Sequence, residues 1–116
     1  MMLTEMTTVP VAALPVQGLK DHLRLGSGFT EDGLQDGLIE AYLRAAMAAV
    51  EGRIGKVLLA RQYRLTVEDW RAAGEQPLPV APVSGIVSVT VVDAANVATG
   101  LAASRYRLVP DLHRPK

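Results

Sequence analysis

The sequence predicts an α+β fold, with helices in the first half of the chain and a small antiparallel β-sheet in the second. Apolar residues recur at helical spacing in two stretches, about residues 16–24 and 30–54. From residue 61 onward, apolar and polar residues alternate one by one, which is the period of a strand. Helices followed by strands indicate an α+β order rather than alternating β and α units. The length of 116 residues fits a single domain.

The first 14 residues are expected to form an extended arm, because they contain three threonines and Pro10 and show no apolar period. Such an arm is either disordered or docked on a neighbour. The arm carries Glu5 and lacks a basic region, so it does not have the pattern of a signal peptide. No apolar run in the chain approaches the ~20 residues that a membrane helix needs.

A short helix is predicted over about residues 16–24. Pro15 precedes it and is tolerated in a first helical turn. Val16, Leu19 and Leu23 follow at helical spacing, and the Gly-Ser-Gly stretch at residues 26–28 ends the helix.

A long helix is predicted over about residues 30–54. Thr30 is a good N-cap, and Glu31 and Asp32 suit the positive end of the helix dipole. The apolar residues cover about half of the helix circumference, whereas a surface helix usually needs an apolar stripe nearer 100° wide. Gly52 and Gly55 stop the helix. The apolar side comprises Leu34, Leu38, Ile39, Tyr42, Leu43, Ala45, Ala46, Ala49 and Val50.

The surplus of apolar surface on this helix implies two burial partners, one of which is another chain. We expect the subunit contact to lie at Ile39, Leu43, Met47 or Val50 rather than in the core of the monomer. Met47 projects among the charged residues of the helix, where an exposed Met has no evident purpose.

The second half of the chain predicts strands. Tyr63, Leu65 and Val67 share one face of the first, and prolines at residues 77, 79 and 82 restrict their own segment to an edge strand or an extended conformation. Residues 87–92 form a second strand, with Val87, Val89 and Val91 on its apolar face and a turn at residues 93–96. Residues 105–109 form a third, antiparallel to the second. We expect one α+β domain over residues 15–110 and a polar tail over residues 111–116.

The chain offers little catalytic chemistry. It has no cysteine and two histidines, which makes a metal site improbable. Asp21 and His22 are adjacent on a helix and therefore point about 100° apart, so they do not form a base and its orienting partner. The acidic pairs at residues 31–32 and 68–69 have local structural roles at element ends. We predict no catalytic, metal or cofactor site, and no enzyme.

A nucleic-acid module is the alternative hypothesis. Residues 52–55 (GRIG) match the GXXG loop that clamps nucleotides in KH domains, and Arg53, Lys56 and Arg64 make the neighbourhood basic. The same residues also fit a helix C-terminus, with glycine stops and cations at the negative end of the dipole. The net charge of zero predicts no bulk attraction to nucleic acid or to an anionic membrane.

Several stretches together resemble phage head–tail connector proteins. Residues 16–25 (VQGLKDHLRL) resemble the opening of these proteins, residues 30–55 their long second helix, and residues 58–65 (LLARQYRL) the strand after that helix. Leu78-Pro79, Pro82-Val83, residues 87–93 and residues 106–108 come in the order that the family shows. Each motif is weak alone, but the order and spacing cover nearly the whole chain.

The resemblance implies an adaptor subunit without enzymatic activity, found in tailed phages and in gene transfer agents. Such subunits form a ring, typically twelve-fold, beneath the portal in the neck of the particle. The implied partners are other copies of the chain, the portal protein and a tail-side stopper or tail protein, with DNA passing through the channel without sequence recognition and no membrane contact. Assembly would take place in the bacterial cytoplasm, and no cofactor is implied.

The chain departs from the family pattern at its end. Family members continue with another strand and a C-terminal helical segment, whereas this sequence stops at residues 111–116. The chain is therefore expected to be either a shorter member or a truncated sequence. The portal contact made by that C-terminal part is correspondingly in doubt.

Overall fold

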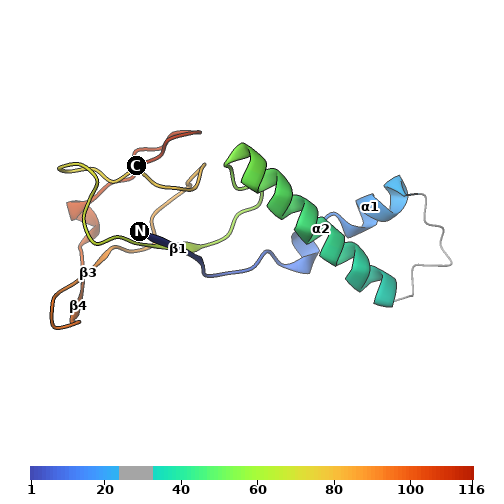
Figure 1. Cartoon of the computed structure of the whole chain (residues 1–116), viewed down its shortest axis with the longest axis horizontal. Coiled ribbons are helices and arrows are strands. Elements are labelled where there is room, and N and C mark those ends of the chain that lie inside the picture. The colour runs from blue at the N-terminus through green and yellow to red at the C-terminus, as the bar shows by residue number, and fades with distance from the viewer. Residues whose placement is uncertain (24–32) are drawn as a thin grey trace. The chain divides into compact units, whose positions relative to one another are not determined.

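The computed structural model describes residues 1–23 and 33–116 (Figure 1). In the second of these ranges, side chains are described from residue 35 onward. The chain forms two compact units, Met1–Thr66 and Val67–Lys116. The predicted domain over residues 15–110 spans parts of both. The expected cap at Thr30, the acidic pair Glu31 and Asp32, and the glycine stop at residues 26–28 lie outside the described residues.

The first unit contains the two predicted helices. Helix α1 is Val16–His22, preceded by the short 3-10 helix η1, Val11–Ala13, and helix α2 is Gly33–Ile54. Helix α2 ends where Gly55 adopts φ +66°, a left-handed conformation that glycine tolerates without a Cβ penalty. Gly55 is thus the predicted stop, whereas Gly52 lies inside the helix.

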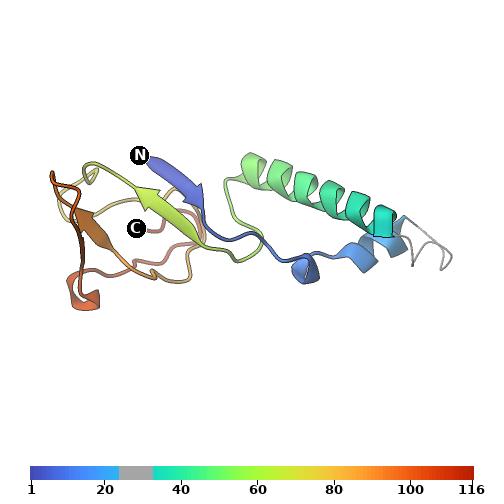
Figure 2. The same ribbon diagram turned by 90° about the horizontal axis from the view of Figure 1, so that it is seen from below.

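The extended N-terminal arm docks on its own chain. Strand β1, Met2–Glu5, pairs antiparallel with strand β2, Tyr63–Thr66 (Figure 2). In this register Leu3 lies opposite Leu65. The pairing continues beyond β1, because the Met6 amide donates to the Gln62 carbonyl. Among the described residues of this unit, the buried apolar side chains are Val9, Leu14 and Ile39.

The second unit is built around a β-hairpin. Strand β3, Thr90–Val92, pairs antiparallel with strand β4, Ala98–Gly100. The turn between them is held by Asp93, whose Oδ1 accepts hydrogen bonds from the amides of Ala95 and Val97. Asn96 adopts φ 62°, a conformation that Asn reaches more readily than most residues.

The prediction of a strand over residues 105–109 was wrong. The partner of the second predicted strand is β4, while Ala103–Arg105 forms the 3-10 helix η3. A short turn closes the hairpin before the more strand-like residues after 105 are reached, and Ala98 and Gly100 have little strand propensity of their own. The α+β class itself is confirmed, although the strands form two separate two-stranded sheets instead of one.

The last residues are folded onto the second unit. Pro115 is buried, and its carbonyl accepts a hydrogen bond from the Leu78 amide. Val109 and Lys116 exchange two backbone hydrogen bonds, and Lys116 Nζ lies 2.8 Å from Glu75 Oε2. The segment predicted as a polar tail therefore contributes to the packing of this unit.

The different environments of two neighbouring residues in α2 give a direct test of the packing. Ile39 is 4% exposed and Leu38 is 53% exposed. We expect Ile39→Ala to lower the free energy of unfolding by about 2–5 kcal/mol, because it leaves a cavity. The matched variant Leu38→Ala should change it by about 0.5 kcal/mol or less, as is usual for exposed positions. Urea unfolding of dilute, monomeric protein measures both, and equal losses would contradict the observed orientation of α2.

Candidate assembly surface

Two ion pairs near opposite ends of α2 set which side of the helix faces its own unit. Near the start, Asp36 pairs with Lys20 of α1, a lysine whose side chain is almost fully buried. Near the end, Glu51 pairs with Arg61, which lies just before β2. Asp36 and Glu51 are 15 residues apart, so at 100° per residue they lie within about 60° of one another around the helix. Both contacts therefore hold the same side of α2 against the rest of the unit.

Arg61 is the centre of the second contact. Its Nη1 and Nη2 lie 3.0 and 2.5 Å from the two carboxylate oxygens of Glu51, an arrangement in which two parallel hydrogen bonds join the groups. Its Nε lies 3.0 Å from Glu5 Oε1 as an ion pair without an aligned hydrogen bond. The guanidinium also sits 5.4 Å from the centre of the Tyr63 ring. With its side chain 7% exposed, Arg61 joins β1, α2 and β2.

The electrostatics of this cluster follow from its geometry. The hydrogen bond from Arg61 lowers the pKa of Glu51, and a further bond from the Leu58 amide acts in the same direction against the effect of burial. The same bond to Glu51 raises the pKa of Arg61. Burial raises the pKa of Tyr63. Glu51 and Arg61 are thus both held in their charged forms.

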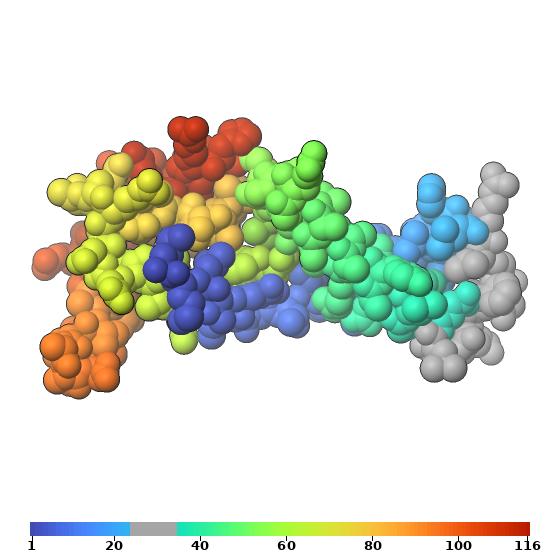
Figure 3. Space-filling view, in the orientation of Figure 1, coloured from blue at the N-terminus to red at the C-terminus, as the bar shows by residue number. Residues whose placement is uncertain are grey.

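The opposite side of α2 is exposed and carries no charge before Arg53, which is exposed in the last turn. Every exposed residue among residues 37–52 is uncharged, whereas Glu40, Arg44 and Glu51 are half-buried. Glu40 and Arg44 pair with each other at 2.9 Å. Figure 3 shows α2 in green at the surface of its unit. We call this surface the outer side of α2; it consists of Gly37, Leu38, Ala41, Tyr42, Ala45, Ala46, Ala48, Ala49, Val50 and Gly52.

This arrangement departs from the usual pattern of a surface helix, in which the exposed side is polar and the apolar residues face the core. Tyr42 is 62% exposed and Val50 is 45% exposed. Contiguous exposed apolar surface of this kind marks an interaction site in soluble proteins. The outer side of α2 is therefore the best candidate for a functional surface in the first unit.

The four predicted interface residues do not share one environment. Ile39 is buried within its own unit, Leu43 and Met47 are half-buried, and Val50 lies on the outer side. Other residues of the outer side, among them Tyr42 and Ala49, were not predicted to lie at the interface. The helical spacing of these residues placed them on the wide apolar arc. The sequence did not show which half of that arc packs against its own chain and which half is exposed.

The basic residues of the nucleic-acid hypothesis lie at the end of α2 and on β2. Arg53 is exposed in the last turn of α2, Lys56 is half-buried, and Arg64 is exposed on β2. The clamp of a KH domain is a loop between two helices, whereas residues 52–54 here are helical and a strand follows. The glycines at residues 52 and 55 therefore do not bound a loop of that kind.

The remaining candidates for chemistry stay apart from any recognisable site. His22 is exposed at the end of α1, and Asp21 accepts a hydrogen bond from Gln17 Nε2 at 2.9 Å. Glu68 and Asp69 are exposed in the second unit. Within residues 1–23 and 33–116, no group of three His, Cys, Asp or Glu side chains could hold a metal ion, and no helix could span a membrane.

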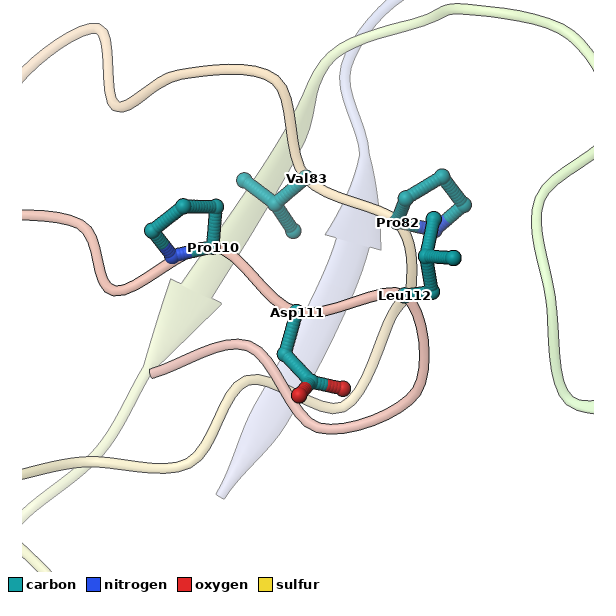
Figure 4. A pocket seen from close by; sticks show the side chains of 5 residues that line it. All are labelled: Pro82, Val83, Pro110, Asp111 and Leu112. Carbon is teal, nitrogen blue, oxygen red and sulfur yellow. The ribbon is translucent and has the colours of Figure 1, made fainter.

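A hollow of about 270 Å³ occurs in the second unit, lined by Pro82, Val83, Pro110, Asp111 and Leu112 (Figure 4). The Asp111 carboxylate accepts hydrogen bonds from the amides of His113 and Arg114 at 2.7 and 2.8 Å, which lower its pKa. This carboxylate thus serves the turn that follows it. The rest of the lining is apolar and offers no group for acid–base chemistry.

Solved structures of gene transfer agent particles contain chains similar to this one. A chain in the structure of the neck of an empty gene transfer agent particle, computed with C6 symmetry, is 51% identical over 99% of this chain, with a TM-score of 0.89. A chain in the virion of a native gene transfer agent particle is also 51% identical over 99% of this chain, with a TM-score of 0.85. No protein-family model and no curated protein matches the chain.

The two matched chains are longer, and this chain covers 58% and 59% of their lengths. Both belong to structures of gene transfer agent particles, and one belongs to the neck. The likeness thus supports a structural neck protein of the head–tail type, as the sequence resemblance implied.

The Arg61 cluster generates a pH-dependent prediction. Glu51→Gln should lower the free energy of unfolding by about 1–3 kcal/mol at pH 7, since it removes a charged hydrogen-bond acceptor from Arg61. The pKa of Glu51 is depressed in the folded chain, so the difference is fully present above the ordinary value of 4.5. The difference in the free energy of unfolding is lost as the pH falls through the lower pKa that Glu51 has in the folded chain.

Glu40→Gln is the matched control, because Glu40 forms an i,i+4 pair that is about one third exposed. We expect it to cost about 0.5 kcal/mol or less. Denaturant unfolding at several pH values between 3 and 7 measures both variants. A Glu51→Gln loss that stays constant across this range would contradict the ionic role of Glu51.

Proposed function

We propose that this chain is a structural subunit of the neck of a tailed phage or phage-like particle. Copies of the chain form a ring beneath the portal, join the head to the tail and line the channel through which DNA leaves. The observation that carries the proposal is the 51% identity over 99% of the chain to a chain in the neck of a gene transfer agent particle. The proposal requires no catalytic residue.

The outer side of α2 adds a physical reason that is independent of the comparison. Burial of apolar surface contributes roughly 25 cal/mol per Å², so an uncharged helix side left in water represents unused binding free energy. A neck subunit has neighbours on several sides, and their contacts bury such surfaces. In a protein that acts alone, charged residues at these positions would increase solubility, so their absence suits a subunit that is covered by neighbours.

The proposed partners are other copies of the chain, the portal protein and a tail-side protein. A ring of twelve copies contains sixfold rotations, so it is compatible with the C6 symmetry in which the matched neck was computed. The chain has equal numbers of acidic and basic residues, which suits DNA passing through without tight binding. The ring would assemble in the bacterial cytoplasm with the rest of the particle.

Portal binding is the direct test of the proposal. Purified chain mixed with portal-bearing, tailless heads should add a ring of density at the portal vertex, seen by negative-stain electron microscopy. Heads that lack the portal are the control and should gain none. Tailless heads with an intact portal that gain no ring at any protein concentration would contradict the proposal. A monomeric state of the chain in solution would not contradict the proposal, because the portal acts as the template on which the ring forms.

The nucleic-acid alternative predicts a different outcome. Under the neck proposal, the double variant Arg53→Ala, Lys56→Ala should bind short DNA or RNA no more weakly than the unmodified chain. The matched control is Arg105→Ala, Arg107→Ala, which removes two exposed arginines from the second unit. Fluorescence anisotropy at several salt concentrations measures this. A salt-dependent affinity that only the first variant abolishes would favour nucleic-acid binding.

A further inference from the structure

The first eight residues of the chain contribute no buried side chain to their unit. Each of them is exposed, including the apolar residues Met2 and Leu3. The first buried side chain along the sequence is that of Val9, which is 2% exposed. Side chains that stay in water add little free energy to a docked segment, because they bury little apolar surface. The chain is therefore anchored in its unit from Val9 onward, and we call residues 1–8 the strap.

Backbone hydrogen bonds hold the strap in place. Strand β1 pairs with β2, and the Met6 amide extends the pairing by donating to the Gln62 carbonyl at 2.8 Å (Figure 2). The Gln62 amide donates in turn to the Thr7 hydroxyl at 2.9 Å. A two-stranded ribbon is marginally stable by itself in water. Segments that bury few apolar contacts and hold exposed hydrogen bonds open locally at low cost, and the strap meets both conditions.

Arg61 does not depend on the strap for its counterion. Its Nη1 and Nη2 both bond the carboxylate of Glu51, whereas its Nε lies 3.0 Å from Glu5 without an aligned hydrogen bond. The Glu5 side chain is 41% exposed and the Glu51 side chain 13%. If Glu5 leaves, Arg61 and Glu51 remain as a neutral pair, so no buried charge loses its partner. Glu5 therefore latches the strap only weakly, as is usual for exposed ion pairs.

We propose that the strap detaches reversibly from β2 while α2 and the contact between Arg61 and Glu51 stay in place. The N–H and C=O groups of β2 that pair with β1 are covered when the strap is docked and free when it is open. A free strand edge of this kind accepts another strand. The strap thus controls whether this edge of β2 is available to anything but its own chain. Strap opening is a property of the free chain and does not depend on the proposed neck function.

A disulfide across the ribbon provides a lock for the test. Because the Met6 amide bonds the Gln62 carbonyl opposite it, alternation makes Leu3 and Leu65 a non-hydrogen-bonded pair. The Cα atoms of such a pair lie about 4.5 Å apart, within the range that a disulfide spans. The chain has no cysteine, so the double variant Leu3→Cys, Leu65→Cys can form no other disulfide within the chain. Its reduced form is the matched control, since only the bond differs.

Hydrogen–deuterium exchange of single amides in the full chain, measured by NMR, tests the opening. The Met6 and Gln62 amides report on the strap, and the Leu43 amide reports on α2. In the unmodified chain and in the reduced variant, the two strap amides should exchange at least about tenfold faster than Leu43 after correction for intrinsic rates. In the oxidised variant this ratio should fall towards one, because the lock prevents the strap from leaving by itself.

Strap amides that exchange faster than Leu43 only while the disulfide is absent or reduced support detachment. Strap amides that exchange no faster than Leu43 in the unmodified chain overturn it, because the strap then leaves only when the whole unit unfolds. Strap amides that stay fast in the oxidised variant also overturn it, because their exchange then does not require the strap to detach. Each of these results leaves the neck function to its own test of portal binding.

Discussion

The setting of α2 by two ion pairs is the constraint on which the rest of the structure depends. Lys20 holds Asp36 near one end of the helix, and Arg61 holds Glu51 near the other. Rotating the helix would leave a buried lysine and a buried arginine without their carboxylates, and uncompensated buried charges are strongly destabilising. The pairs thus specify one rotation. In that rotation Asp36 and Glu51 face their own unit, and the alanines of α2 face outward.

This constraint links the architecture to assembly. Among the described residues, the first unit buries few large apolar side chains, and each sheet has two strands. A two-stranded sheet is marginal alone and needs packing against other surfaces. The outer side of α2 is a surface through which neighbouring copies could supply that packing. Under the proposed neck function, a subunit built this way would gain part of its stability on assembly, which favours assembled over free protein.

Much of the fold was predictable because its local signals were strong. The helical period and the glycine stop at Gly55 appear in the structure. Of the strand predicted over residues 87–92, only Thr90–Val92 is a strand. The strand over residues 105–109 was misassigned, because strand propensity cannot identify which segment pairs with which. The candidate surface was only half predictable. The sequence showed that the apolar arc of α2 was too wide, but the side facing inward is fixed by contacts to Lys20 and Arg61, which lie outside the helix.

The most direct measurement is a reconstruction of a particle neck containing this chain, at a resolution that shows side chains. We predict that the outer side of α2, around Tyr42 and Ala49, is covered by another copy of the chain. Glu51 should remain paired with Arg61 in every copy. A neck in which Tyr42 and Ala49 face open solvent, while the charged side of α2 forms the contact between copies, would contradict this role of the helix.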